Sequence, residues 1–153
     1  MNGAAYAGRR LGGVLAAASL AIALAAAAAA ADPRVDYMLH CRGCHGPDGG
    51  GAPGAAPSFR GQLAKFLWVA GGREYLVRVP GTAQSELDDA RTAALLNWLL
   101  REFSPDEIPA DFAAYAADEV AHLRRAPLTD VWSARRELLR AIAVGPGRAG
   151  EAR

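Results

Sequence analysis

Residues 41–45 read Cys41-Arg42-Gly43-Cys44-His45: two thiols two residues apart, with a histidine directly after the second. On one turn of helix the two sulfurs can reach the two vinyl groups on one side of a porphyrin, and the next residue can direct its imidazole at the iron. This spacing is the attachment signature of c-type haem. We therefore predict one covalent haem c, with Cys41 and Cys44 as thioether anchors and His45 as the proximal iron ligand.

Two other uses of a Cys-x-x-Cys pair remain open as alternatives. A dithiol redox pair normally opens a helix inside a βαβ unit, and no strand pattern surrounds residues 41–45. A zinc site needs further ligands, but the chain has two cysteines, and His40 and His122 lack the spacing of a ligand pair. The histidine that directly follows Cys44 favours haem attachment over both.

The first 31 residues have the composition of an export signal. Arg9 and Arg10 form a positively charged start, residues 11–31 carry no charge, and small residues before Asp32 permit cleavage there. We therefore predict that residues 1–31 are a signal peptide and that the rest works in the periplasm. The alternative is an uncleaved membrane anchor, because the apolar stretch is just long enough to span a bilayer.

The charge balance does not favour a nucleic-acid partner. Without Arg9 and Arg10 the chain keeps 15 basic and 16 acidic side chains, so its formal charge is −1. Proteins that bind nucleic acid usually carry a basic surface. We expect contact with a membrane only if residues 1–31 are retained.

The chain from residue 32 onward predicts helices joined by loops and no strands. Asp32-Pro33 combines a capping side chain with a proline at the first helical position, and this helix should run to Gly46-Pro47. A loop rich in glycine and proline follows over residues 49–57. Apolar spacing then predicts further helices over residues 62–69, 73–78, 89–102, 118–125 and 130–143.

Residues 41–57 read C-R-G-C-H-G-P-D-G-G-G-A-P-G-A-A-P and resemble the class I cytochrome c pattern C-x-x-C-H-G-x-x-G-x-G followed by a proline. The resemblance extends over residues 35–103 and implies an all-α, cytochrome c-like domain over residues 32–103, wrapped around the haem. It also implies that the Pro57 carbonyl accepts a hydrogen bond from the His45 imidazole, which would fix the ring and raise its basicity. The alternative for Pro57 is an ordinary loop proline.

The same resemblance predicts how the first and last helices of that domain meet. Leu95 and Trp98 resemble the leucine–aromatic pair that packs the last helix against the first. Their partners should lie around Tyr37 and Met38. We therefore expect Met38, the one methionine after residue 31, to belong to the core.

The distal iron ligand that is usual in this family is missing. Where its electron-transfer members carry Met-Pro, this chain reads Val79-Pro80, and valine cannot bind iron. His122 could serve only if the C-terminal segment folds over the haem. Lys65 is a weaker candidate, and His40 should point elsewhere on its helix. The remaining alternative is an open site or one filled by water.

A C-terminal extension over residues 104–144 continues beyond a minimal cytochrome, and residues 145–153 should be a disordered tail. The extension is polarised, with five acidic side chains over residues 104–119 and mostly arginines over residues 124–148. We expect a solvated helical hairpin that covers one side of the domain. The alternatives are a docking surface for a partner and a lid over the haem.

These features predict a periplasmic one-electron carrier, or the cytochrome subunit that accepts electrons from a dehydrogenase, and not an enzyme in its own right. Its redox partner would be a dehydrogenase or an oxidase. We expect it to dock near residues 60–80, a stretch that contains four basic side chains and one glutamate. The alternative is a haem protein whose open distal site binds CO, NO or peroxide. A missing methionine ligand should also lower the reduction potential.

Overall fold

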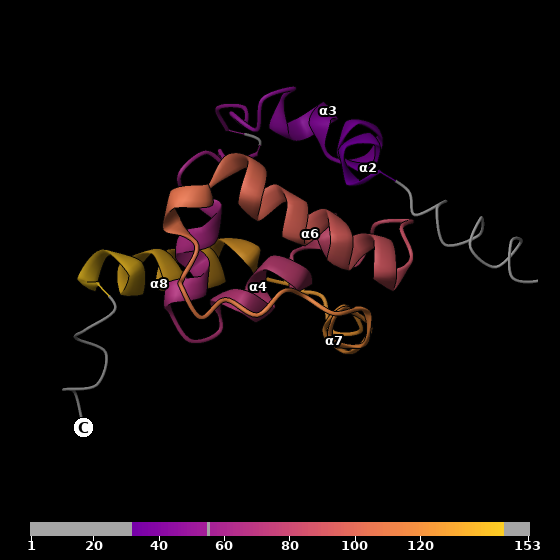
Figure 1. Ribbon diagram of the computed structural model, residues 1–153. Helices are drawn as coiled ribbons and strands as arrows, with labels where there is room; N and C mark the ends of the chain where they lie inside the picture. The colour runs from indigo at the N-terminus through magenta and orange to yellow at the C-terminus, as the bar shows by residue number, and fades with distance from the viewer. Residues whose placement is uncertain (1–31, 55, 146–153) are drawn as a thin grey trace, which may run out of the picture. The chain divides into compact units, whose positions relative to one another are not determined.

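The computed structural model describes residues 32–54 and 56–145 of the protein (Figure 1). The predicted signal peptide, residues 1–31, and the predicted tail from residue 146 onward lie outside the described residues. None of the helices in the described ranges combines the length and the apolar character needed to cross a membrane.

The described chain is all-helical, which confirms the predicted fold class, and it contains no strand beyond an isolated bridge between Ala52 and Ala56. Seven α-helices and two 3₁₀ helices follow one another within these ranges: α2 (Pro33–His40), α3 (Arg42–His45), η1 (Leu63–Trp68), α4 (Gly72–Arg78), α5 (Pro80–Ala83), α6 (Asp89–Phe103), η2 (Pro105–Glu107), α7 (Ala117–Leu123) and α8 (Val131–Val144).

Aspartate side chains begin the three longest helices. Asp32 accepts a hydrogen bond from the Arg34 amide at the start of α2, and Asp88 accepts one from the Arg91 amide at the start of α6. Asp130 does the same for α8. Each carboxylate satisfies a backbone N–H that the first turn of a helix leaves without an intrahelical partner.

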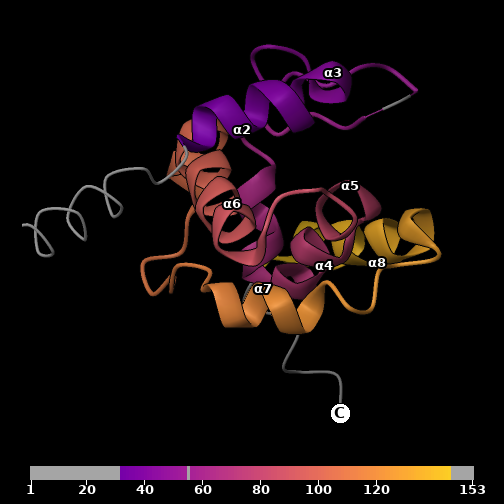
Figure 2. The same ribbon diagram turned by 90° about the vertical axis from the view of Figure 1, so that its right-hand side faces the viewer.

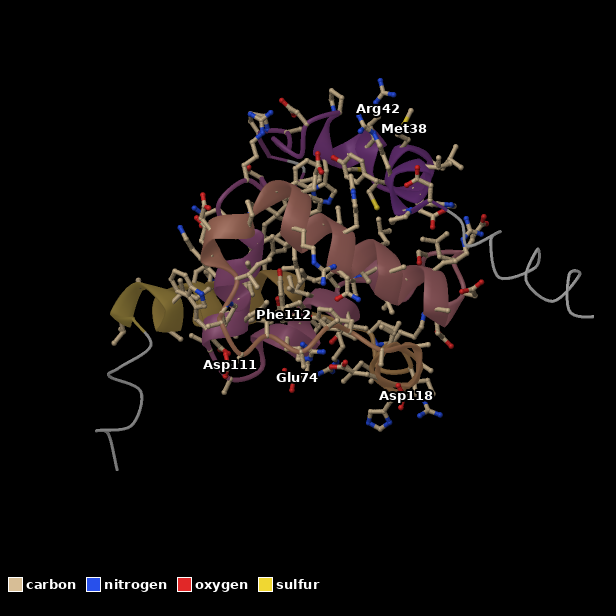
Figure 3. The ribbon with its side chains drawn as sticks, in the orientation of Figure 1. Met38, Arg42, Glu74, Asp111, Phe112 and Asp118 are labelled. Carbon is tan, nitrogen blue, oxygen red and sulfur yellow. The ribbon has the colours of Figure 1, made fainter. Side chains whose placement is uncertain are left out.

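Helix α2 packs against α6, and aromatic rings fill the contact. The Tyr37 ring is 2% exposed and lies 5.6 Å from the Trp98 ring and 5.2 Å from the Phe103 ring, between centroids. The expectation that Met38 joins this contact is wrong: Met38 lies on the outer side of α2 and is 51% exposed (Figure 3). One residue further along a helix turns the side chain by about 100°, so Tyr37 and Met38 cannot share a face.

The C-terminal segment packs on the same core as the helices before it. Helix α7 lies against α6 and α4, and it buries Val120 completely. Helix α8 lies against η1 at another part of the surface, as the separate positions of α7 and α8 in Figure 2 show. The two helices therefore cover different elements of the fold.

Candidate functional site

The attachment motif lies where α2 gives way to α3. Cys41 interrupts the helix with φ −122° and ψ −38°, and α3 then carries Cys44 and His45. The three side chains line one cavity of about 360 Å³. Cys41 is half-buried, Cys44 is exposed, and both thiols are free. One wall of the cavity therefore presents two free thiols and an imidazole.

The loop after α3 orients the His45 ring. Its Nδ1 lies 3.1 Å from the Pro57 carbonyl oxygen. Burial lowers the pKa of His45, and the hydrogen bond to Pro57 opposes this change with a smaller effect. The ring is then neutral near pH 7, so Nδ1–H donates to the carbonyl and the Nε2 lone pair is free to bind a metal.

Close backbone contacts hold Pro57 in place. The Gly51 amide donates to the His45 carbonyl oxygen at 2.8 Å, and the Ala52 amide donates to the Ala56 carbonyl oxygen at 2.9 Å. Gly51 has φ +74°, and a Cβ at this position would meet the Ala56 carbonyl oxygen at 2.4 Å. A glycine is therefore required here by both its conformation and its surroundings.

The remaining walls of the cavity are mostly apolar. They come from the loop after Pro57, from η1, α4, α5 and α6, and from the C-terminal helix α8. Figure 2 shows α3 on one side of the fold and α4, α5 and α8 on the other. The apolar lining side chains are Phe59, Leu63, Phe66, Leu76, Val79, Pro80, Leu95, Leu96, Leu99 and Val131.

This donor set fits a covalently attached haem. Two thiols and a neutral imidazole are the groups that thioether attachment and axial iron binding require, and the apolar walls suit a porphyrin face. Burial raises the pKa of Cys41 to about 11, so its thiol is protonated at neutral pH. Ser85 also lines the cavity, but its Oγ is buried and has no hydrogen-bond partner among the described residues.

The structure does not bring the distal-ligand candidates Lys65 or His122 into the cavity lining. His122 is exposed on α7, and its Nδ1 lies 3.2 Å from Arg125 Nη2. Helix α7, which carries His122, packs against α6 and α4 and contributes no residue to the cavity lining. His40 does line the cavity, which contradicts the expectation that it points elsewhere.

Several polar residues of the site, Ser85 and Arg135 among them, were not identified from the sequence. Ser85 follows α5 in a short loop, and Arg135 lies on α8 with its guanidinium carbon 5.3 Å from the Phe66 ring centroid. Val131 and Arg135, four residues apart, both face the cavity. That spacing places them on one face of α8, but the sequence does not show which element this face meets.

The arginines expected to form a docking face are engaged within the chain. Arg60 pairs with Asp48. Arg73 forms two hydrogen bonds with Glu119, at 2.5 and 2.7 Å, and Arg78 donates to the Ala126 carbonyl oxygen at 2.7 Å. Arg73 and Arg78 therefore hold the C-terminal extension against α4.

No family model matches the chain. Two proteins from Thermus thermophilus, both named cytochrome c-552, are 34% identical to it over 107 residues. Each match covers 58% of this chain, and the matches cover 82% and 72% of the two relatives.

Proposed function

Because the chain belongs to the c-type cytochromes, which are typically electron carriers, we propose that it acts outside the cytoplasm as a single-haem one-electron carrier for a partner dehydrogenase or oxidase. The observation that carries this proposal is the single cavity wall on which Cys41, Cys44 and His45 meet. The matches to two proteins named cytochrome c-552 support it.

Each part of the site has a task in such a carrier. The haem, when bound, supplies an iron that cycles between two oxidation states. Cys41 and Cys44 tether it, and His45 offers its Nε2 lone pair. The Pro57 carbonyl holds the imidazole in one tautomer and raises its basicity, which favours the ferric state. The apolar walls keep water from the cavity, and this favours the less charged ferrous state.

Electrons would enter and leave beside the attachment motif. Cys44 is exposed, so the haem edge tethered there would lie at the surface. Met38 and Leu39, which are 51% and 71% exposed, lie in the last turn of α2, shortly before Cys41. Exposed apolar side chains next to the redox centre would let a partner dock without strong charge complementarity.

Spectroscopy of protein from a host that attaches haem c tests this proposal. We expect a covalent haem that resists acid extraction and a reversible one-electron titration. Cys41→Ala/Cys44→Ala should abolish covalent attachment, and His45→Ala should change the axial-ligand spectrum. Wild-type protein that emerges colourless with both thiols free would overturn the proposal.

The residues at the start of α5 support a second function. This part of the cavity wall consists of Val79, Pro80, Gly81 and Thr82. None of these side chains is an ordinary ligand of haem iron. We propose that the sixth iron position accepts small ligands. Reduced holoprotein should then be high-spin and bind CO at once. A low-spin spectrum that CO leaves unchanged would leave only the carrier function.

A further inference from the structure

Asp36 is a carboxylate that the fold buries completely. It lies on α2, where this helix packs against α6, and it is 0% exposed. The Arg91 guanidinium of α6 pairs with it, through Nη2 to Oδ1 and through Nε to Oδ2 at 3.4 Å. Burying a carboxylate without an opposite charge is unfavourable, so Arg91 makes this position tolerable for an acid.

The two charges of this ion pair differ in their contact with water. The Asp36 side chain is fully buried, whereas the Arg91 side chain is 40% exposed. Water screens the field of an exposed charge much more than the field of a buried one. Arg91 therefore offsets Asp36 only in part, and the surroundings of Asp36 keep a net negative electrostatic potential.

That negative electrostatic potential reaches the first haem anchor. Asp36 precedes Cys41 by five residues, which is about 7.5 Å along a helix axis at about 1.5 Å per residue. The Cys41 amide donates to the Tyr37 carbonyl oxygen at 2.9 Å, so the helical backbone extends to the anchor. The pKa of the Cys41 thiol is raised chiefly by burial and further by the charge of Asp36. A haem bonded to Cys41 would therefore lie within the field of Asp36.

We propose that the buried Asp36 carboxylate lowers the reduction potential of the haem, and that Arg91 limits this effect by offsetting part of the charge. A negative charge near the haem stabilises the ferric state, which carries one more positive charge than the ferrous state. Neither residue lines the cavity, so both act through their charge and not by contact. This inference rests on the proposed function, because it requires a haem at Cys41.

Spectroelectrochemical titration of the full-length holoprotein tests the proposal. Asp36→Asn removes the negative charge and keeps the shape of the side chain, so the reduction potential should rise. We expect the equilibrium constant for reduction to increase about three- to tenfold, and tenfold corresponds to about 59 mV for one electron. Glu102→Gln is the matched control, because it removes the same charge from an exposed position on α6. It should change that constant by less than about twofold.

The double variant Asp36→Asn/Arg91→Gln separates an electrostatic role from a structural one. Asp36→Asn alone leaves the Arg91 charge unopposed, whereas the double variant removes both charges and pairs two amides. Its reduction potential should therefore lie between those of Asp36→Asn and the wild type. If Asp36→Asn does not fold, the double variant still tests the proposal, because its potential should exceed that of the wild type.

Arg91→Lys tests whether the charge of Arg91 or its shape matters for the haem. Lysine keeps the positive charge but cannot make two contacts with one carboxylate in the geometry of a guanidinium. This variant should therefore have a lower melting temperature than the wild type and an almost unchanged reduction potential. A purely structural ion pair would instead change the two quantities together.

Three results would overturn the proposal. If the reduction potential stays the same or falls in Asp36→Asn and in the double variant, the ion pair only holds α2 against α6. The wild type would still titrate as a one-electron carrier in that case, so the proposed function would stand. Equal shifts in Asp36→Asn and Glu102→Gln would trace the effect to net charge alone. Wild-type protein without covalent haem would refute both this inference and the proposed function.

Discussion

Arg135 brings a positive charge into a cavity with mostly apolar walls. Its guanidinium lies over the Phe66 ring, and it forms no hydrogen bond or ion pair with another described residue. The carboxylates of a haem are suitable partners for such a group. A cation held near the haem favours the ferrous state, because that state carries less positive charge.

We predict that Arg135→Gln lowers the reduction potential by roughly 20–60 mV, since 59 mV corresponds to about 1.4 kcal/mol for one electron. Spectroelectrochemical titration of the holoprotein measures the change. Arg136→Gln is the control, because Arg136 is exposed and donates to the Ser133 hydroxyl. If both variants shift the potential equally, Arg135 has no specific partner in the cavity.

The parts of the site differ in how far the sequence could predict them. Cys41, Cys44 and His45 fall within five residues, so local spacing was enough to place them on one wall. Ser85 and Arg135 come from segments that are 40 and 90 residues further along the chain, and only tertiary packing brings them to the cavity. Their residue types, serine and arginine, are common on protein surfaces and give no signal of their own.

At the scale of elements, one cluster ties α7 and the loop before it to α4. Tyr115 is 4% exposed, its hydroxyl donates to the Arg73 carbonyl oxygen at 2.9 Å, and the Arg73 guanidinium lies 4.0 Å from its ring centroid. The hydrogen bond from Arg73 to Glu119 raises the pKa of that guanidinium. Burial raises the pKa of Tyr115 well above its ordinary value.

This raised pKa predicts that stability falls in alkali. Above about pH 10 the unfolded chain loses the Tyr115 proton while the folded chain keeps it, so ionisation favours unfolding. The contribution of Tyr115 to the free energy of unfolding is fully present below pH 10. Above pH 10 it falls by up to about 1.4 kcal/mol per pH unit. Tyr115→Phe should therefore cost about 1 kcal/mol at pH 7, for the lost hydrogen bond, and less at pH 11.

Denaturant unfolding of the holoprotein at the two pH values measures this difference. A gap between wild type and Tyr115→Phe that is the same at pH 7 and pH 11 would show that Tyr115 ionises equally in both states. Such a result would place the hydroxyl in contact with water and contradict its burial.

The elements themselves were partly predictable. The capping side chain of Asp32 marked the start of α2, because a cap acts within its own turn. Residues 62–69 were expected to be helical, and Leu63–Trp68 adopts the tighter 3₁₀ form. Helix α5 was not predicted: Pro80 begins it, but its four residues are too few for an apolar period to show.

At the scale of the whole molecule, the cavity lies inside the shared core. Leu95, Leu96 and Leu99 of α6 line it, and each is at most 6% exposed. Val131 of α8 lines it as well. The extension is therefore part of the pocket, a role that the sequence left open because charge patterning alone does not show which face of a helix is covered.

An empty cavity of this size should be too costly for the fold. Without haem, the apolar side chains that line the cavity would contact water or collapse on one another, and a small domain has only about 5–15 kcal/mol of stability to lose. We therefore predict that Cys41→Ala/Cys44→Ala, purified without haem, keeps part of its helix signal but loses cooperative thermal unfolding. Circular dichroism melts of this variant beside the wild-type holoprotein measure the difference. A sharp, cooperative melt of the haem-free variant near the wild-type temperature would mean that the walls close on themselves and that the haem is not part of the core.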